Sequence, residues 1–266
     1  VTERTAAELA RLAAGTPAAR AFEPGAERAT AGTLFTLGLA ARALEYLHPE
    51  GGVDSFSIRG WVEDETNHGW LWLPYLESHA AELQPLLAAC VDLAIVSVLS
   101  LRPNPSRRIW LVMDECDSLG QLGQLEAALT KGRKNGLCVI AGFQDVAQAR
   151  KNYGRNSAQT ILSNLRNLIC FNSADPDTAM YMSKRLGNAE LLRSEKSEGE
   201  RGCSISERRV PGQIVLDGEI ENLPNLTAFL NLAGDYPVTK ISIPYRAPVE
   251  RIKPFIPLIP RQDGKA

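Results

Sequence analysis

Residues 109–115 read Ile109-Trp110-Leu111-Val112-Met113-Asp114-Glu115, an unbroken apolar run that ends in two adjacent carboxylates. Five apolar residues in a row predict a strand buried on both faces, which is typical of parallel sheets. At the carboxyl end of such a strand, side chains enter the crevice in which open α/β sheets bind their ligands. Asp114 and Glu115 are therefore candidate site residues. The same pair is also explained by an acidic turn that ends a strand and faces solvent.

Beyond this run, apolar strands alternate with helical stretches. The predicted strands are 109–113, 137–141 and 168–171, and the predicted helices are 122–134, 145–166 and 175–186. This alternation predicts an α/β fold with a mainly parallel sheet between helices. Residues 190–209 are charged and rich in Ser and Gly, which predicts a mobile hairpin or loop, and residues 213–245 return to short strands. The many prolines of residues 254–260 predict an extended tail.

The first hundred residues are mostly helical in pattern. Helices are predicted at 2–14 and 30–47, and the Pro/Gly cluster at 48–52 is the best candidate for a domain boundary. A short apolar run, 69–75, has strand character.

The apolar run 83–101 raises the question of a membrane span. It carries Asp92 in its middle, and a carboxylate at that position is costly in lipid. A buried helix of a soluble protein is therefore the favoured interpretation.

Composition limits the chemistry that the chain can perform. The 29 basic and 31 acidic side chains give a formal charge of −2, so any contact with DNA must be local. The five cysteines form no C-x-x-C pair, which argues against a disulfide framework or a zinc site and indicates a reducing, cytoplasmic compartment. The three histidines show no ligand spacing, so a metal held mainly by side chains is not expected.

Two further polar positions are candidates for the same site. Gln144 follows the predicted strand 137–141, where its amide could contact a γ-phosphate; alternatively, it only caps the next helix. Arg133 lies in the basic run 131–136. It is a candidate arginine finger that reaches a neighbouring subunit's nucleotide, or else a cation that favours the helix dipole, with Gly136 as the residue that ends the helix.

The acidic strand end resembles the Walker B element of P-loop ATPases of the RecA and AAA kind. In addition, residues 113–120, 125–136 and 142–145 together resemble the TraD/TrwB class of conjugative coupling proteins. Residues 56–61 and 235–240 are similar to that class too, so the resemblance covers about residues 53–246.

This resemblance implies a RecA-like P-loop NTPase core that uses ATP and Mg2+. Asp114 would orient the water shell of the magnesium ion, and Glu115 would polarise the attacking water as general base. Gln144 would contact the γ-phosphate, and Arg133 would stabilise the transition state.

The resemblance also implies the surroundings of the motor. The motor would form a homohexameric ring at the inner face of the bacterial inner membrane and deliver relaxase-bound single-stranded DNA to a type IV secretion channel during conjugation. Its partners would be single-stranded or double-stranded DNA, the relaxase or relaxosome, and the proteins of the channel. Residues 1–52 would belong to an inserted all-helical domain, and residues 53–266 to the carboxyl-terminal part of the nucleotide-binding domain. No G-x-x-x-x-G-K-[ST] motif and no amino-terminal membrane helices occur, so this piece alone is expected to be inactive.

Two other functions fit the sequence. A related chromosome-segregation or HerA-type translocase shares the acidic strand and the glutamine. A non-hydrolytic docking module would only present surfaces to DNA or to DNA-processing proteins.

Overall fold

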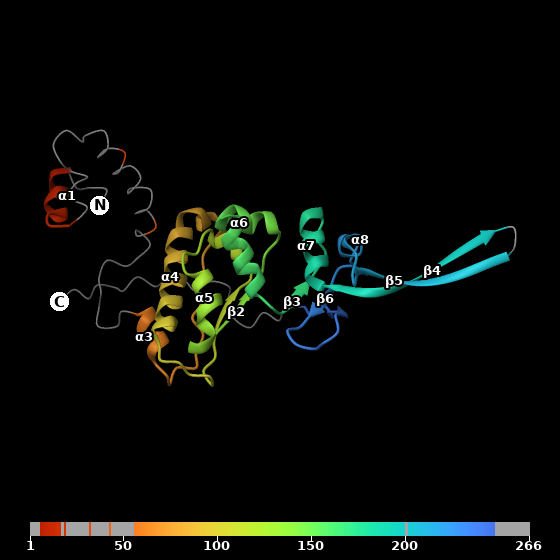
Figure 1. The fold of residues 1–266 in the computed structure, drawn as a ribbon. Coiled ribbons are helices and arrows are strands. Elements are labelled where there is room, and N and C mark those ends of the chain that lie inside the picture. The colour runs from red at the N-terminus through yellow and green to blue at the C-terminus, as the bar shows by residue number, and fades with distance from the viewer. Residues whose placement is uncertain are drawn as a thin grey trace. The chain divides into compact units, whose positions relative to one another are not determined.

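The computed structural model describes residues 6–16, 19, 32, 43, 56–199 and 202–247, without the side chains of 191–208. The chain divides into two compact units, residues 1–166 and 167–266 (Figure 1). The predicted boundary at 48–52 and the tail at 254–260 lie outside the described residues, as does nearly all of the predicted helix 30–47, so these stay predictions.

The first unit is built mainly from helices around a pair of strands. In chain order its elements are α1 (Ala6–Ala13), α3 (Ile58–Glu63), η3 (Glu77–His79), α4 (Ala80–Ser100), β1 (Ile109–Met113), η4 (Cys116–Leu119), α5 (Leu125–Lys131), η5 (Gly132–Asn135), β2 (Leu137–Ala141) and α6 (Val146–Asn164).

Strands β1 and β2 pair in parallel, from Ile109 opposite Leu137 to Met113 opposite Ala141. This confirms the parallel pairing predicted from the two apolar runs. Helix α5 packs against β2 and against its helical neighbours α4 and α6 (Figure 1). Fully buried side chains on these elements include Ile95 and Leu125.

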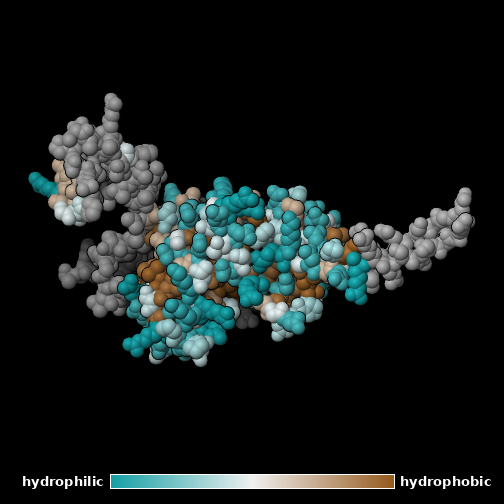
Figure 2. Space-filling model, in the orientation of Figure 1, coloured by the Kyte–Doolittle hydropathy of each residue, from teal (hydrophilic) through white to brown (hydrophobic). Residues whose placement is uncertain are grey.

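One face of the β1–β2 pair is bare among the described residues. Trp110, Val112 and Ile140 point to this face and are 56%, 51% and 52% exposed. The prediction that β1 is buried on both faces is therefore wrong for this chain, because no described element packs on that side. In the view of Figure 2, brown hydrophobic residues are exposed between teal hydrophilic ones.

Helix α4 corresponds to the apolar run that raised the question of a membrane span. By length and composition alone, the helix could cross a membrane, and core helices of soluble proteins meet the same criterion. Its mid-helix carboxylate, Asp92, accepts hydrogen bonds from the backbone N–H groups of Gly123 and Gln124, each at 2.9 Å. It thereby joins α4 to the start of α5.

The segment 69–75 forms no strand, so that prediction is wrong. Trp70 and Trp72 stack on each other with ring centroids 5.6 Å apart and are 70% and 74% exposed. The structure places residues 69–75 in no helix or strand, and among the described residues no strand pairs with them.

The second unit contains β3 (Leu168–Cys170), α7 (Pro176–Leu186), β4 (Asn188–Gly199), β5 (Gly202–Gln213), α8 (Asp217–Glu221), β6 (Thr227–Asn231) and β7 (Thr239–Ser242). Strand β3 was expected to join the parallel sheet; instead it pairs antiparallel with β6, which pairs antiparallel with β7. Strands β4 and β5 form the hairpin that the charged segment predicted. The core consists of Cys170, Ala179, Leu186, Val215, Ile220, Leu223 and Phe229.

Candidate functional site

The carboxyl ends of β1 and β2 bring three predicted site residues to one edge. Asp114 and Glu115 directly follow β1, and Gln144 lies three residues beyond β2. The Gln144 side-chain amide donates a hydrogen bond of 2.6 Å to Oε1 of Glu115. All three side chains are exposed, so a ligand can reach them. The predicted position of these residues at a shared edge is confirmed, whereas their catalytic roles remain predictions.

The spacing of this edge depends on a glycine. The N–H of Gly142 donates to the carbonyl of Met113 at 2.8 Å, and the N–H of Cys116 donates to the carbonyl of Gly142 at 2.9 Å. A Cβ atom at position 142 would lie 2.0 Å from the carbonyl oxygen of Asp114. Only glycine permits this approach, which holds the two polar turns side by side.

Gln144 is not the cap of the following helix. The residue that caps α6 is Asp145, whose carboxylate accepts a hydrogen bond from the N–H of Gln148. The Gln144 side chain is therefore engaged only with Glu115 among the described residues.

Asp117, which lies behind this edge, was missed by the sequence reasoning. It is only 6% exposed, and its two oxygens have no hydrogen-bond partner of normal geometry. Burial raises its pKa above the ordinary value, the nearby charges of Asp145 and Glu115 add to this, and the N–H of Gln144 partly opposes it. No sequence signal separates Asp117 from the exposed acids around it, because its burial depends on how the η4 turn folds.

Tyr153 anchors the η4 turn to helix α6. Its hydroxyl accepts a hydrogen bond of 3.3 Å from the N–H of Leu122 and lies 3.9 Å from Sγ of Cys116. Burial raises the pKa of Cys116 to about 11, so this thiol is neutral near pH 7 and is not an activated nucleophile. Both residues support the turn that follows Glu115.

Arg133 lies at the opposite edge of the strands. It is exposed on η5, just before β2 begins, whereas Gln144 lies beyond the end of that strand. A strand of five residues spans about 16 Å, so the structure does not bring Arg133 to the acidic pair of its own chain. Gly136 ends η5 in the left-handed conformation, with φ of 89°, as the helix-end interpretation predicted.

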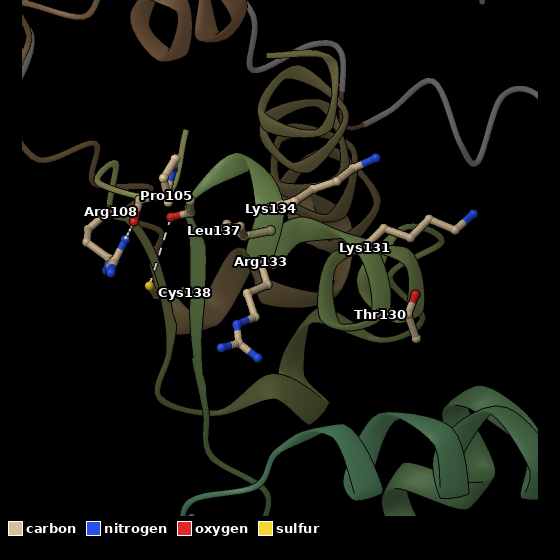
Figure 3. A pocket seen from close by; sticks show the side chains of 9 residues that line it. Pro105, Arg108, Thr130, Lys131, Arg133, Lys134, Leu137 and Cys138 are labelled. Atoms are coloured by element: carbon tan, nitrogen blue, oxygen red, sulfur yellow. Dashed lines mark hydrogen bonds between the residues drawn. The ribbon is translucent and has the colours of Figure 1, made fainter. Parts of the chain in front are cut away.

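A cavity of about 900 Å³ surrounds Arg133. Its lining residues include four cations, and Figure 3 shows their side chains pointing in different directions from the end of α5, from η5 and from the residue before β1. The four are Arg108, Lys131, Arg133 and Lys134. The basic character of this edge contrasts with the acids at the other end of the same strands.

Among the described residues, no group of three or more His, Cys, Asp and Glu side chains could hold a metal ion. The polar edge therefore offers one or two carboxylates and an amide, which suits an ion that takes its other ligands from water and phosphate oxygens.

Adjacent acids and a glutamine at the carboxyl ends of neighbouring parallel strands are the arrangement expected of the class of RecA-like nucleotide-binding proteins. Residues 1–244 match the model of the type IV secretion-system coupling protein DNA-binding domain. The chain belongs to this family, as its resemblance to the TraD/TrwB class predicted.

Known relatives agree with this assignment. The coupling protein TraD of Escherichia coli K12 is 28% identical over 251 residues, which are 91% of this chain and 35% of TraD. The conjugal transfer protein TraG of Rhizobium radiobacter is 33% identical over 157 residues, which are 58% of this chain and 24% of TraG. The chain thus spans about a third or less of these relatives.

Solved structures of TrwB have the same fold. The unbound form of TrwBdeltaN70, a bacterial conjugative coupling protein, superposes with a TM-score of 0.83 at 36% identity, covering 96% of this chain and 59% of TrwB. TrwB in complex with ADP and Mg2+ superposes with a TM-score of 0.79 at 36% identity, covering 94% and 57%. These matches confirm the predicted RecA-like α/β fold.

Proposed function

We propose that this chain is part of the ATP-hydrolysing motor of a coupling protein that delivers relaxase-bound DNA to a type IV secretion channel during conjugation. The observation that carries the proposal is the hydrogen bond of 2.6 Å between Gln144 and Glu115 at the carboxyl edge of two parallel strands. The family assignment favours a coupling protein over a chromosome-segregation translocase or a docking module.

The polar edge fits ATP and Mg2+. Solved complexes of TrwB contain ADP with Mg2+ and, in another case, a non-hydrolysable ATP analogue. Asp114, exposed at the strand end, is placed to hold the water shell of the ion. Glu115 is placed to take a proton from the attacking water. The bound nucleotide supplies the scissile phosphoanhydride bond.

The Gln144 amide links the general base to the phosphate. Its N–H group now donates to Glu115, and the same group can instead turn to a terminal phosphate oxygen. Such a turn would release Glu115 to accept a proton from water, so the glutamine would couple occupancy of the site to activation of the base.

The two edges of the first unit carry opposite charge. Asp114 and Glu115 lie at the carboxyl edge, and Arg133 lies among cations at the amino edge. Because Arg133 is distant from its own acidic pair, an arginine finger at this position would act on the site of another copy. Head-to-tail contact of this kind is heterologous and closes into a ring when the rotation permits. This supports the arginine-finger role of Arg133 and a homohexameric ring.

Other parts of the motor lie outside these 266 residues. The sequence contains no G-x-x-x-x-G-K-[ST] motif, whose backbone and lysine would hold the phosphates. We therefore expect this piece alone to bind ATP weakly and not to hydrolyse it. In the whole protein we place the motor at the inner face of the inner membrane, attached through amino-terminal helices, with DNA, the relaxase and the secretion channel as partners.

The test is conjugative transfer and DNA-stimulated ATP hydrolysis by the full-length protein. Glu115→Gln should reduce both, with turnover falling on the order of a hundredfold or more, because the general base is lost. Glu126→Gln, a matched change at an exposed position on α5, should leave both near the parental level. Parental hydrolysis by Glu115→Gln would contradict the proposal.

A further inference from the structure

Successive residues of the η5 turn, which carries Arg133, are hydrogen-bonded to the loop before β1 or to the first residue of β1. The backbone carbonyls of the three residues after Arg133 each accept a hydrogen bond from that loop or from the first residue of β1. The bonds run from Asn104 N to Lys134 O at 3.0 Å, from Arg107 Nη1 to Asn135 O at 3.4 Å, and from Ile109 N to Gly136 O at 2.9 Å. The backbone beneath Arg133 is therefore fixed by non-local contacts.

Arg107 is the centre of these contacts. Its side chain is only 14% exposed. Besides Asn135, its guanidinium donates to the carbonyl of Arg102 at 2.9 Å and to Oε1 of Glu65 at 2.7 Å. One planar group thus joins three segments, which a lysine ammonium cannot match in geometry.

The neighbouring residues fit closely around Arg107. A Cβ atom at Gly136 would lie 2.6 Å from the carbonyl oxygen of Arg107. Asn135 is 2% exposed, and its side-chain amide donates to the carbonyl of Leu101, at the start of the same loop. The η5 turn and the loop before β1 therefore form one packed unit.

The side chain of Arg133 contrasts with this fixed backbone. No described residue accepts a hydrogen bond from its guanidinium, which extends from η5 into the cavity (Figure 3). The direction of the Arg133 side chain is therefore set by the backbone of the turn rather than by hydrogen bonds of its guanidinium.

We propose that Arg107 is a positioning residue for Arg133. By fixing the backbone of the turn, it orients the Arg133 side chain toward the nucleotide of a second copy of this chain. The proposal rests on the arginine-finger role given above. Because Arg107 also lies two residues before β1, it ties the finger to the strand that carries the subunit's own Asp114 and Glu115.

The experiment compares Arg107→Gln with Arg102→Gln in the full-length protein. Arg102 is an exposed cation of the same loop whose side chain makes no described contact, so it controls for loss of charge. Arg107→Gln should lower the kcat of DNA-stimulated ATP hydrolysis about tenfold to a hundredfold, because a displaced finger misses the transition state. Its KM for ATP should stay within about threefold of the control, because its own site is intact.

Mixed rings separate positioning from a general loss of structure. Arg107→Gln subunits keep their own general base, and Glu115→Gln subunits keep their finger, so a mixture contains some intact composite sites. Mixing the two inactive proteins should give more hydrolysis than the sum of the parts. If Arg107→Gln lowers the melting temperature strongly, Arg107→Lys, which keeps the charge but not the fork, takes its place in the same assay.

Two results would overturn the inference: turnover of Arg107→Gln within about twofold of Arg102→Gln, or an inactive variant that mixing does not rescue. Arg133→Ala, measured in parallel, tells the two proposals apart. Parental turnover of Arg133→Ala rejects the finger and this inference together. Rescue of Arg133→Ala by mixing, without rescue of Arg107→Gln, rejects only the positioning role.

Discussion

Gln144 and Glu115 form a hydrogen bond of 2.6 Å between the ends of two parallel strands. Both side chains are exposed, so the bond is made at a surface that a ligand can enter. An amide held against a carboxylate in this way fixes the orientation of the carboxylate. Both groups are therefore within reach of a ligand at this edge.

Gln144→Ala should lower turnover of the full-length protein at least about tenfold while ATP affinity changes only a few-fold. The reason is that Glu115 loses the group that orients it and the phosphate loses a contact made in the transition state. Steady-state hydrolysis and equilibrium ATP binding measure the two effects. Gln148→Ala, on the helix α6 that follows Gln144, is the control. A Gln144→Ala protein as fast as that control would remove Gln144 from the mechanism.

Asp114→Ala should weaken ATP binding only when Mg2+ is present. In the proposed role the carboxylate would hold the ion's water shell, so binding measured in EDTA should be the same for parent and variant. Glu115→Gln should bind normally in both conditions. Titration of the full-length proteins with a fluorescent ATP analogue distinguishes these cases, and equal Mg2+-dependent affinity for Asp114→Ala and the parent would show that other groups hold the ion.

Gly142→Ala should destabilise the full-length protein by about 1–3 kcal/mol or force the two turns apart, because the added methyl group meets the carbonyl oxygen of Asp114 at 2.0 Å. Hydrolysis should fall as well, since Glu115 and Gln144 separate. Gly218→Ala is a suitable control because a Cβ atom there meets nothing within 4 Å. Thermal unfolding followed by ATPase assays gives both readouts; equal melting temperatures for the two variants would contradict the predicted clash.

Asp117→Asn should stabilise the protein near pH 7. Burial raises the pKa of Asp117 in the folded state, so the folded protein holds this proton more tightly than the unfolded chain. The carboxylate therefore lowers stability as pH rises from its ordinary pKa of 3.8 through the raised value. The difference in melting temperature between variant and parent should be largest near neutral pH and should shrink toward pH 4. A difference that does not change with pH would show that ionisation of Asp117 is not its cause.

The site was predictable where it depends on local sequence. Each of β1 and β2 is a continuous apolar run followed by polar residues, and parallel pairing then brings Glu115 and Gln144 to the same edge. The burial of Asp117 and the contacts of Arg107 were not predictable, because they depend on segments that meet only after folding. The antiparallel pairing of β3 was missed for the same reason: three apolar residues are compatible with either direction of neighbour.

The bare face of the β1–β2 pair makes Trp110 an internal optical probe. Its indole is 56% exposed, so its fluorescence should resemble that of tryptophan in water. Packing of another layer on this face would replace that water by apolar atoms and shift the emission to shorter wavelengths. With the other three tryptophans, Trp61, Trp70 and Trp72, replaced by phenylalanine, packing on this face could be followed without an added label, and separately from any measurement of nucleotide turnover.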